Sequence, residues 1–160
     1  MCGWIKKGKV KELKSNAGRH RLNVNGAINI ETLSTVVDYG DSLNAQSTIS
    51  LFKKLESKNP DAEVIYTVCD NARYYISKMV KEYLEESKIK LLFLPPYSPN
   101  LNLIERLWKY FRKIVLYNKY YETFDEFKNA CKTFFRRIKR HKDDISSLLT
   151  ENLQIIGTNT

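Results

Sequence analysis

Apolar and polar positions follow two different periods along this chain, and the order of these patterns predicts its elements. Alternation predicts a half-buried strand over 21–31, and residues 32–40 predict a second strand antiparallel to it. Apolar residues at helical spacing then predict a helix over 46–58, which Asn59 and Pro60 end.

Two nearly continuous apolar runs predict the central strands. The run 63–70 is rich in β-branched residues, as expected of a strand that is covered on both faces, and 89–95 predicts another buried strand. Between them, apolar positions recur at i, i+3, i+4, i+7 and i+8 from Ile76 to Leu84, which predicts an amphipathic helix.

The C-terminal part predicts two helices. One begins at Leu101, after a loop stiffened by prolines, and carries a single apolar stripe. The other opens at Thr123, which forms a capping-box pattern with Glu126, and buries a seam of Phe residues. The predicted order is strand, strand, helix, strand, helix, strand, helix, helix. It indicates a mixed α/β sheet with helices on both sides.

Length and composition suit one domain. The chain has 160 residues and no apolar run long enough to span a membrane, and its N-terminus lacks the apolar core of a signal peptide. Its three cysteines are too few and too scattered for a disulfide framework or a zinc site, which favours a reducing intracellular compartment. We divide the chain into a basic irregular arm at 1–20, a core at 21–120, and a basic amphipathic helical region at 121–160.

Positive charge is concentrated at two places. The net charge is +9, with +6 in residues 1–21 and +8 in residues 105–142, so the remaining residues carry −5. Basic blocks of this kind suit a polyanion such as nucleic acid, because each neutralised phosphate releases counterions. A solvated basic surface is the alternative.

Two carboxylates are predicted to lie at the same end of the sheet. Asp70 ends the apolar run 63–70, and Glu105 follows 34 intervening residues later, in the first turn of the helix that begins at Leu101. Ligands gather at the carboxyl ends of strands in open α/β sheets. The alternatives are that Asp70 only caps the next helix and that Glu105 only pairs with Lys109.

The chemistry that fits such a pair is phosphodiester cleavage. Negative charge builds on the attacking and leaving oxygens, and two Mg²⁺ ions about 3.5–4 Å apart stabilise both. Hard cations take oxygen ligands, so Asp and Glu suffice and Cys or His are not needed. A third carboxylate is expected in a complete site.

The motifs VCDNARYY at 68–75 and LLFLPPYSPNLNLIERLWKYFRK at 91–113 resemble those of DDE-type transposases of bacterial insertion sequences related to mariner elements. The upstream GWIKKGK and NVNGAINIETL are similar to that family too, so the resemblance covers residues 3–120. It implies a ribonuclease-H-like fold. It also implies Mg²⁺-dependent cleavage and joining of transposon-end DNA, with Mn²⁺ as a substitute metal.

Carried over by position, the resemblance makes Asp70 the second and Glu105 the third acidic residue of the catalytic and metal-binding triad. Asn71 and Asn102 belong to the same motifs and are expected to support the site by hydrogen bonding. Many relatives have a His where Tyr75 stands here, so no role is transferred to that position.

The family's first catalytic Asp precedes the segment that resembles GWIKKGK, and this chain starts at Met1, after that point. Asp38 and Asp41 match no acidic motif of the family. We therefore expect the C-terminal part of a transposase, without the first strand, the first Asp or the N-terminal helix-turn-helix. An upstream polypeptide would supply the strand and the Asp. The alternative function is a non-catalytic DNA-binding or assembly remnant.

The expected partners are transposon-end and target DNA, with a homodimer as a further hypothesis and no membrane. The expected location is the bacterial cytoplasm, in association with the nucleoid. The expected DNA-binding residues are Lys6, Lys7, Lys9, Arg19, Arg21, Lys109, Arg112, Arg136 and Arg137.

Overall fold

The computed structural model describes residues 7, 20–96 and 101–150, and their elements follow the predicted order. The elements are β1 (Asn23–Ile28), β2 (Thr35–Gly40), α1 (Ala45–Lys58), β3 (Ile65–Cys69), α2 (Lys78–Glu85), β4 (Ile89–Phe93), α3 (Leu103–Val115), α4 (Phe124–Arg136), the 3₁₀ helix η2 (Ile138–His141) and α5 (Lys142–Thr150). The predicted mixed α/β class is confirmed. The predicted last helix, whose apolar seam ran to Ile138, ends at Arg136, and η2 and α5 follow it.

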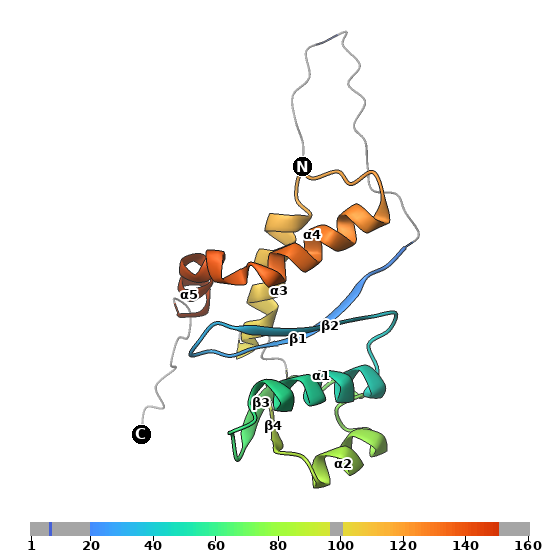
Figure 1. The fold of residues 1–160 in the computed structure, drawn as a ribbon, viewed down its shortest axis with the longest axis vertical. Coiled ribbons are helices and arrows are strands. Elements are labelled where there is room, and N and C mark those ends of the chain that lie inside the picture. Colours follow the sequence, from blue (N-terminus) through green and yellow to red (C-terminus); the bar gives the residue numbers. More distant parts are fainter. Residues whose placement is uncertain (1–6, 8–19, 97–100, 151–160) are drawn as a thin grey trace.

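Strands β1 and β2 form an antiparallel hairpin that lies between two helical layers (Figure 1). The Asn29 side chain shapes its turn, because its oxygen accepts hydrogen bonds from the backbone N–H groups of Glu31 and Thr32 at 2.9 and 2.8 Å. The turn therefore falls where the hydrophobic pattern predicted it.

The two faces of the hairpin pack against different helices, because successive side chains of a strand point to opposite faces. Val36 and Ala27 belong to the core under α1, whereas Val24 and Val37 belong to the core under α3 and α4. Gly26 lies on the α3 side. A Cβ built on Gly26 would come within 3.1 Å of the Trp108 ring of α3, so the absent side chain lets the helix pack closely against β1.

Strands β3 and β4 pair in parallel, with Val68 opposite Leu92. One face packs against α1 and α2 through the buried Ile89 and the partly buried Ile65 and Leu91. The prediction that 63–70 is covered on both faces is wrong. Tyr66 is 69% exposed, Val68 54% and Leu92 48%, because no described element packs on their face. In the described part of the chain the strands form two two-stranded sheets.

The helix termini carry specific caps. A complete capping box opens α1, in which Asn44 and Ser47 each bond the other's backbone N–H. At α4, Thr123 accepts from Glu126 as predicted, at 3.2 Å. The return bond differs from the predicted box, because the Glu126 carboxylate accepts from the N–H of Glu122.

Glu56 of α1 joins that helix to the segment between α2 and β4. Its carboxylate accepts hydrogen bonds from the Tyr83 hydroxyl at 2.5 Å, the Ser87 hydroxyl at 2.6 Å and the Lys88 N–H at 3.0 Å. Burial alone would raise the pKa of Glu56, but these hydrogen bonds outweigh it and lower the pKa below its ordinary value of 4.5.

We predict that Gly26→Ala lowers the free energy of unfolding by about 1–3 kcal/mol, because the new methyl group would crowd Trp108 and the hairpin backbone. Urea denaturation measures this loss. The control is Gly40→Ala, where the nearest atom to the new Cβ lies 3.7 Å away. Equal stability of Gly26→Ala and the native protein would show that α3 does not pack closely against β1.

We predict that Glu56→Gln lowers the free energy of unfolding by about 1–2 kcal/mol at pH 7. A lowered folded-state pKa means that the stabilisation is complete above pH 4.5 and is lost as the pH falls through the lower folded-state value. Urea denaturation over this pH range should therefore show the two proteins converging in acid. Glu85→Gln, at an exposed position on α2, is the control, and a Glu56→Gln effect independent of pH would contradict the prediction.

Candidate active site

Asp70 immediately follows β3 and is exposed. One of its carboxylate oxygens accepts a hydrogen bond from the N–H of Ala72 at 3.1 Å. Helix α2 begins only at Lys78, and its N-cap is Ser77, whose side chain accepts from Val80. The alternative role for Asp70, as the cap of that helix, is therefore excluded.

Asn71 holds the ends of the two parallel strands together. Its side-chain amide donates to the carbonyl oxygen of Leu94 at 2.8 Å, and the N–H of Leu94 donates to the carbonyl of Cys69 at 2.9 Å. The backbone on which Asp70 stands is thus fixed from both strands.

Glu105 lies in the first turn of α3 and is exposed. The helix begins after the buried N-cap residue Asn102, whose carbonyl accepts from the N–H of Glu105 at 3.1 Å and whose side chain makes no capping bond. The apolar stripe of α3, which includes Leu107, packs into the core and leaves Glu105 at the stripe's edge. Glu105 forms no ion pair with Lys109, so that alternative is not supported.

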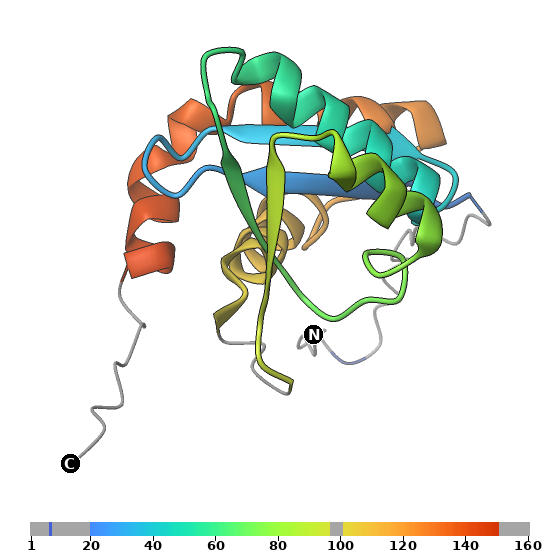
Figure 2. The ribbon, with the colours of Figure 1, turned by 90° about the horizontal axis from the view of Figure 1, so that it is seen from below.

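Tyr74 lies near both carboxylates. Burial raises the pKa of the Tyr74 phenol, and the negative charges of Asp70 and, more weakly, Glu105 raise it further. Figure 2 shows β3 and β4 running in the same direction, with α3 beginning at the end of the molecule where these strands finish. Asp70, which follows β3, and the first turn of α3, which carries Glu105, therefore lie at the same end of the parallel pair.

Two residues close to Asp70 in the chain, Cys69 and Tyr75, are neutral and pack inward. Cys69 is buried, and burial together with the charge of Asp70 raises the pKa of its thiol to about 11, so it carries no thiolate near neutral pH. Tyr75 stacks on Phe52 of α1 at 6.4 Å between ring centroids and is part of the core.

Within the described ranges, no group of three or more His, Cys, Asp or Glu side chains is placed to hold a metal ion. Asp38 is committed elsewhere, since its carboxylate pairs with Lys54 at 2.5 Å. Burial alone would raise the pKa of Asp38, but the hydrogen bonds from Lys54 and Ser50 lower it. Asp41 follows β2, and its carbonyl oxygen accepts from Asn23.

Asp70 and Glu105 nonetheless suit a divalent cation. Both are hard oxygen donors, both are exposed, and no described Lys or Arg forms an ion pair with either. Asn71 and Asn102 stand beside them on the backbone that positions each carboxylate.

The predicted DNA-binding residues fall into several groups. Lys6, Lys9 and Arg19 lie outside the described residues, and Lys7 and Arg21 are exposed. Lys109 and Arg112 are exposed on α3 at i+4 and i+7 from Glu105, so they share its side of the helix.

The remaining two, Arg136 and Arg137, lie at the end of α4 and line different surface depressions. Arg136 lines a trough beside β2, whereas Arg137 lines another depression near Ile114 and His141. Arg106, adjacent to Glu105, reaches α5 and donates to the carbonyl of Leu148 at 3.0 Å.

A family model described as DDE superfamily endonuclease matches residues 2–128, and the chain belongs to this family. The resemblance inferred from the motifs is thus confirmed. The chain is 28% identical over 107 residues to the insertion element IS630 uncharacterized 39 kDa protein of Shigella sonnei, covering 66% of this chain and 31% of that protein. It is 34% identical over 92 residues to the transposable element Tc3 transposase of Caenorhabditis elegans, covering 56% of this chain and 28% of that protein.

Among solved structures, the chain resembles the Mos1 transposase paired-end complex with left transposon end. The TM-score is 0.61 at 16% identity, over 94% of this chain and 50% of that chain. At this identity the similarity concerns the fold, and it confirms the predicted ribonuclease-H-like class. The matches thus cover between 28% and 50% of the length of these relatives.

The sequence did not predict Tyr74 as a neighbour of both carboxylates. The signal was available in the VCDNARYY motif, because Tyr74 follows Asp70 by four residues. The proximity depends on the turn at 73–76, because this turn places the phenol near the strand end. In the described part of the chain, no helix is long and apolar enough to cross a membrane.

We predict that Asp70→Asn and Glu105→Gln each lower the pKa of the Tyr74 phenol, with the larger shift for Asp70→Asn. Removing a nearby negative charge makes the phenolate less unfavourable. An NMR titration of ¹³C-tyrosine-labelled protein, with the signal assigned through Tyr74→Phe, measures both shifts. Glu31→Gln, in the hairpin turn, is the control. A Tyr74 pKa insensitive to Glu105→Gln would mean that the carboxylates do not converge.

Proposed function

We propose that Asp70 and Glu105 are two of the three carboxylates of a site that cleaves and joins DNA during transposition. The observation that carries the proposal is the electrostatic effect of both carboxylates on Tyr74, since it supports their meeting at one end of the β3–β4 pair. Membership in the DDE superfamily endonuclease family supports the reaction class.

Asp70 and Glu105 would hold divalent metal, which we propose to be two Mg²⁺ ions in the complete site. When bound, the metal stabilises negative charge on the attacking and leaving oxygens of the phosphodiester. Asn71 keeps Asp70 in place by joining the ends of β3 and β4, and Asn102 begins the helix that presents Glu105. They are positioning residues.

Lys109 and Arg112 are proposed to bind phosphates next to the reacting one. They follow Glu105 by one and two turns on the same side of α3 and are exposed. Cationic side chains at this distance orient the DNA backbone without reading its sequence.

The third carboxylate and a further strand are proposed to come from an upstream polypeptide. The support is the uncovered apolar face of the parallel pair, with Tyr66, Val68 and Leu92 about half exposed or more. A large uncovered apolar face marks a surface that another segment covers, and an unpaired strand edge can accept an added strand.

Two copies of the chain are proposed to act together in the bacterial nucleoid. The support for a dimer is that the similar Mos1 transposase structure is a paired-end complex with transposon-end DNA. The basic surface of the chain, with a net charge of +9, is suited to a DNA-rich location.

The test joins an upstream segment carrying a strand that ends in Asp to this chain and assays nicking of transposon-end duplexes in Mg²⁺. We expect nicking that falls at least about 100-fold in Asp70→Ala and in Glu105→Ala, because each removes a metal ligand. Glu85→Ala, at an exposed position on α2, is the control. Full activity in either active-site variant would exclude the assignment.

The same assay decides the alternative of a non-catalytic DNA-binding or assembly remnant. That alternative predicts salt-sensitive DNA binding by the 160-residue chain with no cleavage in any metal. Cleavage by this chain alone, lost in Asp70→Asn, would rule it out.

A further inference from the structure

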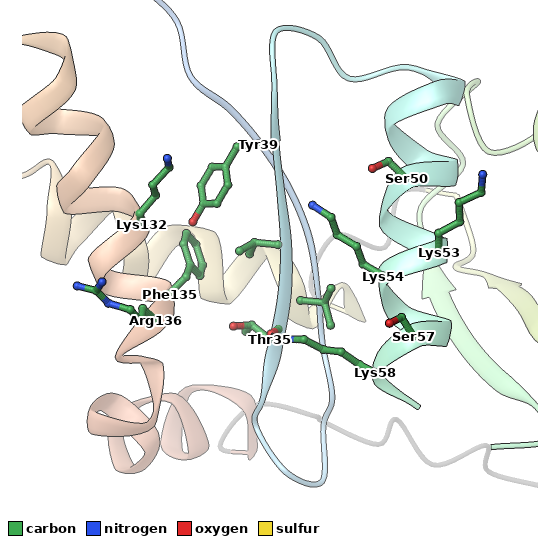
Figure 3. A pocket seen from close by; sticks show the side chains of 12 residues that line it. Thr35, Tyr39, Ser50, Lys53, Lys54, Ser57, Lys58, Lys132, Phe135 and Arg136 are labelled. Atoms are coloured by element: carbon green, nitrogen blue, oxygen red, sulfur yellow. Dashed lines mark hydrogen bonds between the residues drawn. The ribbon is translucent and has the colours of Figure 1, made fainter. Parts of the chain in front are cut away.

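A trough of about 730 Å³ runs along the free edge of β2, between α1 and α4. Five cationic side chains line it, which we call the β2-edge cations: Lys53, Lys54 and Lys58 from α1, and Lys132 and Arg136 from α4. Figure 3 shows the two helices on either side of the strand. None of the lining residues is acidic, and neither Asp70 nor Glu105 is among them.

Of the five cations, only Lys54 has an ion-pair partner among the described residues. Lys54 pairs with Asp38, and Lys58 donates to the carbonyl of Thr35 at 3.2 Å. Within the described residues, neither Lys53 nor Arg136 has an ion-pair partner. Even after Asp38 is counted, the surface holds a net charge of +4 with no counter-charge on its walls.

The floor of the trough does not suit the stacking of bases. Val36 and Phe135 are buried, and the Lys132 ammonium lies over the Tyr39 ring, 6.0 Å from its centroid. Single-stranded nucleic acid binds best where aromatic faces are open to its bases. The trough therefore suits duplex nucleic acid, whose phosphates are exposed and whose bases are stacked inside the helix.

The strand edge is also blocked against pairing with another strand. Lys58 occupies the carbonyl of Thr35, and lysines along an edge strand oppose strand addition. That role could explain Lys54 and Lys58, whose side chains reach toward β2 (Figure 3). It does not explain Lys53, Lys132 and Arg136, which make no hydrogen bond to the strand among the described contacts.

From this geometry we propose that the β2-edge cations form a second binding surface, for the phosphate backbone of duplex DNA, separate from the carboxylate site. The rows on α1 and α4 place cations about one turn apart, ~5.4 Å along each helix, on both sides of the strand. Contacts of this kind are independent of base sequence and depend strongly on salt. The proposal depends on the proposed function only in taking DNA as the partner.

The test is fluorescence anisotropy of the full chain with a labelled duplex, in EDTA, over a range of salt. The variant is Lys53→Gln/Lys132→Gln/Arg136→Gln, which keeps the bonds of Lys54 and Lys58. We expect the Kd to rise at least about 10-fold and the slope of log K against log salt to fall by about 2–3, at roughly 0.9 per phosphate contact.

The control removes the same charge elsewhere, as Lys78→Gln/Lys81→Gln/Lys90→Gln, at exposed positions outside the trough. Single Lys53→Gln and Arg136→Gln variants, each expected to weaken binding about threefold, decide the question if the triple variant does not fold. Equal losses in the trough and control variants would overturn the proposal. The proposal would also be overturned if binding of a labelled polyglutamate peptide depended on these residues and DNA binding did not.

Because EDTA removes divalent metal, the binding assay does not involve the carboxylate site. Loss of DNA binding in the trough variant with no effect of Asp70→Asn would support the proposal even if the nicking assay fails. Conversely, nicking that depends on Asp70 with unchanged binding in the trough variant would reject the proposal alone.

Discussion

The contact between Trp108 of α3 and Gly26 of β1 is the constraint on which the rest of this structure depends. Any side chain at Gly26 would meet the indole ring or the hairpin backbone at 3.1 Å, so the helix can lie this close only against glycine. Trp108 also packs edge-on against Phe111 and Phe135, which joins α3, α4 and the hairpin in one core. Glu105 stands three residues before Trp108, so the same contact fixes where the second carboxylate lies.

The second core holds the other half of the site. Phe52 and Leu55 of α1 pack with Val80 of α2 and Ile89 of β4, while Glu56 ties α1 to the start of β4 by hydrogen bonds. The parallel pair that carries Asp70 therefore rests on α1, and α1 rests on the opposite face of the hairpin from α3. The hairpin therefore sets the relative position of the two carboxylates, because the elements that carry them pack on its opposite faces.

The order and type of the elements were predictable from sequence because each has a clear apolar period. The α1 stripe at Ile49, Phe52 and Leu55 is buried as its spacing indicates. The coverage of β3 was not predictable. An apolar run shows that Tyr66 and Val68 are suited to burial, but it cannot show whether another segment is present to bury them.

The candidate site was predictable only in part, for a related reason. Asp70 and Glu105 follow from strand ends, helix starts and family motifs, all of which are local in sequence. The position of Tyr74 depends on a turn without periodicity. The β2-edge cations come from helices about 80 residues apart in the chain, so neither segment alone indicates the trough. Lys53, Lys54 and Lys58 even lie in the part of the sequence between the two basic blocks, which is acidic in sum.

The central proposal is that Asp70 and Glu105 together bind divalent metal. Paramagnetic broadening of NMR signals by Mn²⁺, in the chain as it stands, tests it most directly. The account predicts that Mn²⁺ selectively broadens the signals of Tyr74 and Asn71, and that Asp70→Asn and Glu105→Gln each abolish this broadening. Broadening that survives Glu105→Gln, or that appears only at other carboxylates such as Glu82, would contradict it.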